Sequence, residues 1–231
     1  MSLLTGGGNN EALDTAKTLL LTLSALFPIV NPLGGSPVFL TYTSDCSRDT
    51  RRNLAKKVAL NSFFVLVGSY FIGSYILEFF GISLPVVQVG GGLIVISTGW
   101  SMLKQGNGDK RRELDQEVTP EDVYGQAFYP LTLPLTIGPG SISVAITLGA
   151  NAAYQRPVDV LGAAAALLAT ALIALSIYLC YAFADRLARV LGTKGMSVLQ
   201  RLSSFLLVCI GVQIFWNGAS SLLKSLLLNV R

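Results

Sequence analysis

The sequence predicts an all-α integral membrane protein with six transmembrane helices, arranged as two inverted-topology repeats of three helices. Three observations predict this class. Of the 231 residues, 52% are hydrophobic and 13% are charged, whereas a soluble domain carries roughly 25% charged residues. The mean hydropathy is +0.58, and several apolar stretches exceed the about 20 residues that cross a bilayer. The composition excludes a soluble enzyme, a disordered chain and a fibrous repeat, so we expect one membrane domain over residues 1–231.

Six apolar stretches are the candidate spans. The second, third, fifth and sixth are typical of uninterrupted spanning helices, whereas Pro and Gly residues interrupt the middle of the first and the fourth. In chain order the stretches are 17–44, 57–80, 83–104, 126–151, 157–184 and 198–223.

One long polar segment, 105–125, separates the first three stretches from the last three. Mixed charges of this kind are typical of a solvated linker, although a regulatory or partner-binding loop is the alternative. We therefore expect a cytoplasmic linker between repeat one, 17–104, and repeat two, 126–224.

Basic residues are distributed unevenly between the two sets of loops. Positive charge favours the cytoplasmic side, so we expect both termini on the non-cytoplasmic side. The net charge of +4 then reflects topology and gives no reason to expect nucleic acid as a partner. Of the 17 basic residues, thirteen follow the first, third and fifth stretches: Arg48, Arg51, Arg52, Lys56, Lys57, Lys104, Lys110, Arg111, Arg112, Arg186, Arg189, Lys194 and Arg201.

The residues that usually carry catalysis or bind metals are scarce. The sequence has no His, and its three cysteines, Cys46, Cys180 and Cys209, show no CxxC spacing. Glu78 and Asp159 are the only carboxylates within the predicted spans, and each lies near an end of its span. These features argue against a divalent-cation pathway and an intramembrane hydrolase. We expect no enzymatic activity, no cofactor and no metal site.

The two interrupted stretches contain matching prolines. Pro32 and Pro37 are five residues apart, as are Pro134 and Pro139, and the two pairs are offset by 102 residues. Proline removes a backbone donor and clashes with the preceding turn, so each pair predicts a broken helix. The alternative is a pair of structural kinks without a ligand.

A weaker echo relates the third and sixth stretches. Gly92 and Gly99 are seven residues apart, as are Gly211 and Gly218, with an offset of 119 residues. Small residues of this kind usually allow tight packing between helices. Three spans in each half force the second half to enter the membrane from the opposite side, which is typical of an inverted repeat.

Broken helices predict a polar site near the middle of the membrane. Their free N–H and C=O groups are tolerated in hydrocarbon only where they are buried or line a wet cavity. N–H groups at a helix start suit a carboxylate, and free carbonyls suit an ammonium group or a cation. Gln88 and Gln213, with Asn217, lie on helices that approach this cavity, or they form interhelical hydrogen bonds. The candidate site residues in the breaks are Asn31, Pro32, Gly34, Gly35, Ser36, Pro37, Thr132, Pro134, Thr136, Gly138, Pro139, Gly140 and Ser141.

Three motifs resemble one known family. FPIVNPLGGSPVFL at 27–40 and PLTLPLTIGPGSIS at 130–143 resemble the paired signatures of the MarC family of bacterial inner-membrane proteins. GISLPVVQVGGGLIVISTGWSML at 81–103 is similar to that family's third span. The resemblance implies six spans and a relation to LysE-like exporters, and some relatives are regarded as transporters of glycine and alanine. The matching motif residues are Asn31, Pro32, Gly34, Pro37, Pro134, Gly138, Pro139 and Gly140.

Together, the breaks and the resemblance predict a secondary transporter for small neutral amino acids or similar zwitterions. One repeat would rock against the other to alternate access to the site. The expected partners are the small-molecule substrate, membrane lipids and a coupling cation, Na⁺ or H⁺. A translocase that flips a phospholipid-type carrier and a non-transporting membrane scaffold are the alternatives.

Overall fold

The computed structural model describes residues 6–104, 125–155 and 160–229, and within these ranges the chain is helical without any strand. Among the described residues, five helical segments are long and apolar enough to cross a membrane, with Leu13–Tyr42 of α1 and α2 counted as one, and the number is six if the bent pair η2 and α6 is one span. The predicted all-α membrane class is therefore confirmed, while all but the last residue of the predicted linker 105–125 lies outside the described residues. The elements are α1 (Gly6–Val30), α2 (Pro32–Tyr42), α3 (Arg48–Phe79), α4 (Leu84–Lys104), η2 (Ala127–Thr136), α6 (Pro139–Gln155), α7 (Val160–Ala182) and α8 (Ala184–Asn229).

The first span is interrupted at Asn31, as the sequence predicts. Asn31 separates α1 from α2 and has left-handed backbone angles, φ 47° and ψ 56°. Its side-chain Oδ1 accepts a hydrogen bond from the Gly34 amide at 3.1 Å and so caps the start of α2. Pro32 occupies the first position of α2, where its missing N–H group costs no helical hydrogen bond.

The fourth span is broken differently. Its first part, η2, is a π-helix that contains Pro130 and Pro134, and it meets α6 at a bend of 72°. The hydroxyl of Thr132 donates to the Ala127 carbonyl at 2.6 Å, and that of Thr136 donates to the Leu131 carbonyl at 2.7 Å. A break in this span was predicted, but the π-helical geometry was not.

The last helix is longer than the predicted sixth stretch, 198–223. It begins at Ala184, and Gly192, with φ +64°, interrupts it before the apolar part from Lys194 to Leu228. Positive φ is accessible to glycine at little cost, so Gly192 allows the short first part to turn away from the spanning part.

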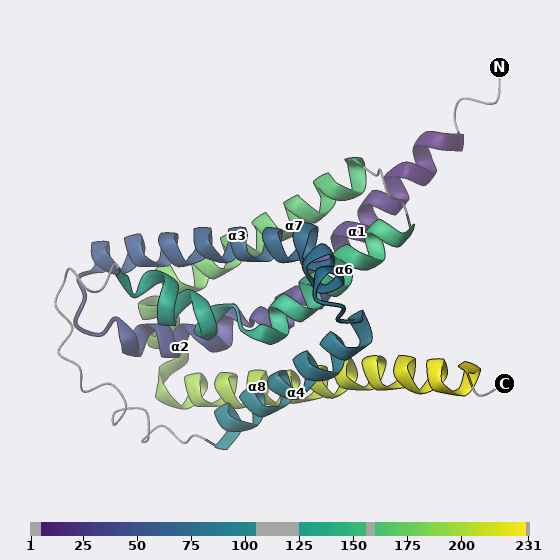
Figure 1. The fold of residues 1–231 in the computed structure, drawn as a ribbon. Helices are drawn as coiled ribbons and strands as arrows, with labels where there is room; N and C mark the ends of the chain where they lie inside the picture. The colour runs from purple at the N-terminus through teal and green to yellow at the C-terminus, as the bar shows by residue number, and fades with distance from the viewer. Residues whose placement is uncertain (1–5, 105–124, 156–159, 230–231) are drawn as a thin grey trace.

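The helices form two groups (Figure 1). In one group, α3 packs against α6 and α7, and α1 packs against α7. In the other, α4 and α8 lie side by side (Figure 1). The second parts of the broken spans join the groups, since α2 packs on α8 and α6 packs on α4. The pairings correspond between the two halves when α1 is matched with η2, α2 with α6, α3 with α7 and α4 with α8. For example, the packing of α3 on α6 corresponds to that of α7 on α2, and the packing of α1 on α7 corresponds to that of η2 on α3.

Glycines bring α4 and α8 into backbone contact. A methyl group added at Gly92 would lie 2.5 Å from the Phe215 amide nitrogen, and one added at Gly211 would lie 2.7 Å from that of Ile96. Each of these glycines also faces the other's carbonyl oxygen. The predicted packing role of Gly92 and Gly211 is confirmed.

The same crossing has a second matched pair of contacts. A methyl group at Gly99 would lie 3.0 Å from the Ser204 carbonyl oxygen, and one at Gly218 would lie 2.6 Å from that of Pro85. The two contacts correspond at an offset of 119 residues, because Gly218 lies 119 residues after Gly99 and Ser204 lies 119 residues after Pro85. The pairings also show that α4 and α8 run antiparallel.

Candidate functional site

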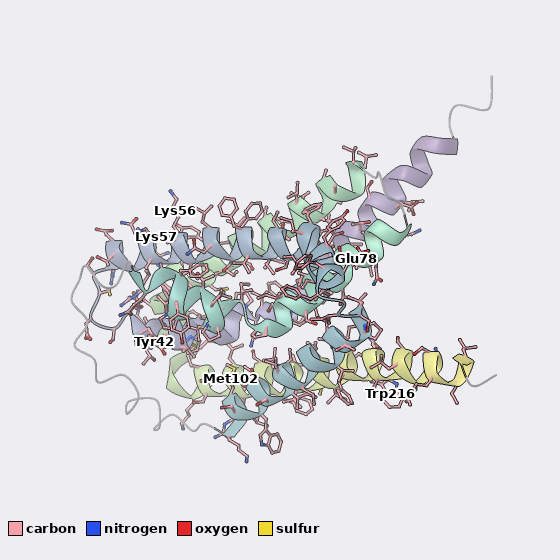
Figure 2. The ribbon with its side chains drawn as sticks, viewed as in Figure 1. Tyr42, Lys56, Lys57, Glu78, Met102 and Trp216 are labelled. Carbon is pink, nitrogen blue, oxygen red and sulfur yellow. The ribbon has the colours of Figure 1, made fainter. Side chains whose placement is uncertain are left out.

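A cavity of about 430 Å³ lies between the two breaks and α4. Its volume falls in the range of small-molecule sites, about 300–1,000 Å³. Met102, which Figure 2 labels near the end of α4, is one of its lining residues. The full lining consists of Ile29, Val30, Asn31, Gly35, Val38, Ile94, Val95, Ser97, Thr98, Ser101, Met102, Pro134, Leu135, Thr136, Gly138, Pro139, Gly140, Ser141 and Leu207.

The cavity brings together eight of the fifteen predicted site residues. Two come from the first break and six from the second, although these segments are about 100 residues apart in sequence. Those in the lining are Asn31, Gly35, Pro134, Thr136, Gly138, Pro139, Gly140 and Ser141. Those outside it are Pro32, Gly34, Ser36, Pro37, Thr132, Gln88 and Gln213.

Several predicted residues outside the lining shape the breaks. A side chain at Gly34 would collide with the amide of Asn31, so the cap requires glycine there. Ser36 is fully buried and donates its hydroxyl to the Leu33 carbonyl at 2.8 Å. Thr132 is also fully buried, and its hydroxyl lies 3.5 Å from the side-chain amide of Asn61 on α3. These groups hold the backbone that faces the cavity.

The two glutamines lie on α4 and α8, outside the cavity lining. The side-chain amide of Gln213 donates to Asn217 at 2.9 Å on the exposed side of α8. Gln88 lies next to Gly218, where an added methyl group would be 2.8 Å from the Gln88 Cβ atom. Neither glutamine reaches the cavity lining.

Two helix starts face the cavity. Helix α2 begins at Pro32, beside the lining residues Asn31 and Gly35, and α6 begins at Pro139, beside Gly138 and Gly140. The first turn of a helix has N–H groups without intrahelical acceptors, and it carries a partial positive charge of roughly half a unit. None of the described residues that line the cavity has an ionisable side chain. The site therefore offers backbone donors and hydroxyl groups in an otherwise uncharged chamber.

Three hydroxyl residues on α4 were not among the predicted site residues. Ser97, Thr98 and Ser101 line the cavity opposite the breaks. The hydroxyl of Thr98 donates to the Ile94 carbonyl at 2.9 Å, which leaves its oxygen able to accept another hydrogen bond. Their spacing of one and then three residues places them along one side of the helix. This spacing is the sequence pattern that could have identified them as site residues.

Tyr181 on α7 contacts both breaks, and no sequence signal indicated it. The side chain is fully buried, and its hydroxyl shares a hydrogen bond with that of Thr136 at 3.0 Å. Its ring stacks on Phe39 of α2 with 4.4 Å between the centroids. A methyl group at Gly35 would lie 2.6 Å from the tyrosine hydroxyl, so this glycine makes room for it.

Comparisons with known proteins agree with the resemblance found in the sequence. Residues 16–223 match the family described as "MarC family integral membrane protein". The inner membrane protein MarC of Salmonella typhimurium is 29% identical over 219 residues, which cover 92% of this chain and 99% of that protein. The inner membrane protein MarC of Escherichia coli strain UTI89 is 30% identical over 218 residues, with the same two coverages. No solved structure gives a significant match.

Proposed function

This chain belongs to the MarC family of integral membrane proteins, and within that family we propose that it is a secondary transporter for small neutral amino acids or similar small zwitterions. The observation that carries the proposal is the cavity of about 430 Å³ that both helix breaks line. Matched interruptions in spanning helices are typical of substrate sites in transporters.

The chemistry of the lining favours a zwitterion. The first turn of α6 supplies backbone N–H groups for a carboxylate, and the starts of both α2 and α6 supply partial positive charge. At α2 the charge acts alone, because Pro32 has no N–H and the amides of Gly34 and Gly35 already bond to Asn31. An ammonium group needs oxygen acceptors, and the hydroxyls of Ser97, Ser101 and Ser141 supply them within the same lining. A substrate with no net charge needs no charged side chain in the cavity, and the described lining has none.

Alternating access requires two halves that can move against each other. The inverted repeat is supported by the matched contacts at Gly92 and Gly211, and at Gly99 and Gly218. It is also supported by the exchange of helix pairings, since α2 on α8 corresponds to α6 on α4. In the proposed cycle one half rocks against the other around the cavity.

We further propose an inner-membrane location with both termini on the non-cytoplasmic side. The relatives are named inner membrane proteins. The start of α1 and the end of α8 point toward the same end of the molecule (Figure 1). Lys56 and Lys57 lie at the other end (Figure 2), where the loop after the first span carries its basic residues. Positive charge at that end favours the cytoplasmic side.

Transport is tested with purified protein in proteoliposomes. Uptake of labelled glycine and alanine is measured with and without imposed Na⁺ or H⁺ gradients. We expect saturable uptake that other small neutral amino acids compete for, and the gradient that drives it identifies the coupling cation. Absence of uptake by correctly inserted, folded protein would contradict the proposal and favour a lipid-carrier translocase.

A further inference from the structure

A second group of polar side chains lies outside the cavity, where α3 begins and α7 meets α8. It surrounds a small hollow of about 40 Å³. A water molecule needs roughly 10–15 Å³ of such space, so the hollow is comparable to one small polar group. Its lining shares no residue with the cavity between the breaks. It consists of Arg48, Arg51, Arg52, Ala182, Phe183, Asp185, Arg186 and Arg189.

One arginine has a structural role at this hollow. Arg51 is buried with 6% of its surface exposed, and it forms an ion pair with Asp185. Its guanidinium also donates to Thr43, at 3.0 Å to the hydroxyl and 2.6 Å to the carbonyl. These bonds join the end of α2, the start of α3 and the start of α8, which fixes the hollow's position between the two halves.

The other four arginines are exposed and converge on the same hollow. Within the described part of the chain, none of Arg48, Arg52, Arg186 and Arg189 forms an ion pair with a carboxylate. The guanidinium groups of Arg52 and Arg186 lie 5.9 and 5.2 Å from the centroid of the Phe183 ring. Contact with one ring from two helices orients both groups, as cation–π interactions do.

We propose that Arg48, Arg52, Arg186 and Arg189 form a binding site for a phosphate group. Guanidinium groups bind phosphate oxygens through paired, charge-assisted hydrogen bonds. Membrane topology requires only that basic residues lie on one side; it does not require arginines from two distant segments to converge on one hollow.

Two sources of phosphate fit this chemistry: the headgroup of an anionic phospholipid and a soluble phosphate. Exposed apolar groups accompany the arginines, since Phe183 is 37% exposed and Val190 is 84% exposed. Basic and apolar groups together are typical of sites at the surface of an anionic membrane. The test therefore has a separate arm for each source.

Binding is measured with the full chain in nanodiscs. In the lipid arm, neutral phosphatidylcholine nanodiscs receive a trace of fluorescent phosphatidylglycerol, and energy transfer from the protein reports local enrichment. In the second arm, inorganic phosphate is titrated into protein in phosphatidylcholine alone. The test variant combines Arg52→Gln, Arg186→Gln and Arg189→Gln, which leaves the Arg51–Asp185 pair intact.

A matched control combines Lys56→Gln, Lys194→Gln and Arg201→Gln, three exposed residues of the same predicted side that do not line the hollow. We expect the test variant to lose roughly tenfold or more in affinity for one probe, and the control to keep most of its affinity. Loss in the lipid arm alone identifies a headgroup site, and loss in the phosphate arm identifies a soluble ligand. Equal losses in both variants, or no binding of either probe by the unaltered chain, would overturn the proposal. The result does not depend on whether the chain transports amino acids.

Discussion

The two helix breaks share their proline spacing but differ in geometry. The residue before a proline is disfavoured in the α conformation. Before Pro32 the chain places Asn31, which adopts the left-handed region and caps the next helix. Before Pro134 it places Leu133, which adopts the extended region, φ −113° and ψ 125°, and has no group to form a cap.

The surroundings compensate for this difference. At the second break, the threonines of η2 bond to carbonyls five residues earlier, and the span bends by 72°. At the first break, α1 and α2 continue as one span from Leu13 to Tyr42. The prolines therefore determine where a span is interrupted, whereas the neighbouring polar side chains determine its shape. Four pairs of substitutions test this comparison.

The largest expected effect concerns the second break. In Gly138→Leu the nearest neighbour of an added Cβ atom, the Pro134 carbonyl oxygen, is 3.6 Å away, so the backbone accepts the change. The rest of the side chain enters the cavity that Gly138 lines. We expect transport in proteoliposomes to fall at least about tenfold, because lost binding energy of roughly 1.4 kcal/mol already has that effect.

The control for this prediction is Gly90→Leu, on α4, where an added Cβ atom has no neighbour within 4 Å. It adds the same side chain away from the cavity lining. Equal transport by the two variants would show that the cavity is not the transport site.

The next prediction separates the contribution of the Asn31 cap to stability from the contribution of its left-handed backbone conformation. Asn31→Ala removes the bond to the Gly34 amide and leaves alanine at positive φ. We expect a loss of about 2 kcal/mol in stability, about half from the cap and the rest from left-handed strain. Asn31→Gly loses the same bond but adopts positive φ without strain, so we expect it to cost no more than about half as much as Asn31→Ala. Thermal unfolding in detergent compares the two: equal destabilisation would show that left-handed strain contributes nothing, and unchanged stability in Asn31→Gly would argue against the cap interpretation.

Thr136 provides the corresponding test at the second break. Thr136→Val removes the hydroxyl that bonds both the Leu131 carbonyl and the buried Tyr181 hydroxyl. An unpaired buried hydroxyl costs about 1–3 kcal/mol, so we expect a loss of stability in that range. Ser36→Ala, which removes a single bond to Leu33 in the first break, should cost about 1 kcal/mol. Thermal unfolding of both variants checks the order, and a larger loss for Ser36→Ala would reverse the comparison.

The smallest effect concerns the residue that contacts both breaks. Tyr181→Phe keeps the ring stacked on Phe39, and Thr136 retains its bond to Leu131. We expect a loss of about 0.5–1.5 kcal/mol in unfolding free energy. Tyr178→Phe removes a hydroxyl from the same helix at a half-buried position and serves as the control. If both substitutions destabilise the protein equally, the Tyr181 hydroxyl has no specific role in joining the breaks.

The parts of the fold that follow from local chemistry could be predicted from the sequence. Apolar length predicted the spans, and Pro32 and Pro139 predicted where helices restart, because proline acts on its own backbone. The glycine spacing in α4 and α8 predicted their close packing.

The rest depended on which helix faces meet. Tyr181 lies outside both motifs and reaches them only because α7 packs against α2 and α1. Ser97 and Thr98 read as ordinary polar residues of a span until α4 is placed opposite the breaks. Gln88 and Gln213 were placed near the cavity from helix membership alone, and the packing of α4 on α8 turns them away from it.

The crossing of α4 and α8 has a consequence for how such a protein can arise. Gly92 meets Gly211, and the contacts of Gly99 recur at Gly218, so these glycine contacts correspond in pairs as they would in an isologous interface. A half-length protein with this helix could pair with a second copy of itself through the same atoms, in antiparallel orientation. Such a dimer needs one sequence to insert both ways. In a chain that carries both halves, each half keeps one orientation in the membrane. The sequences of the two interface helices can then change independently of each other.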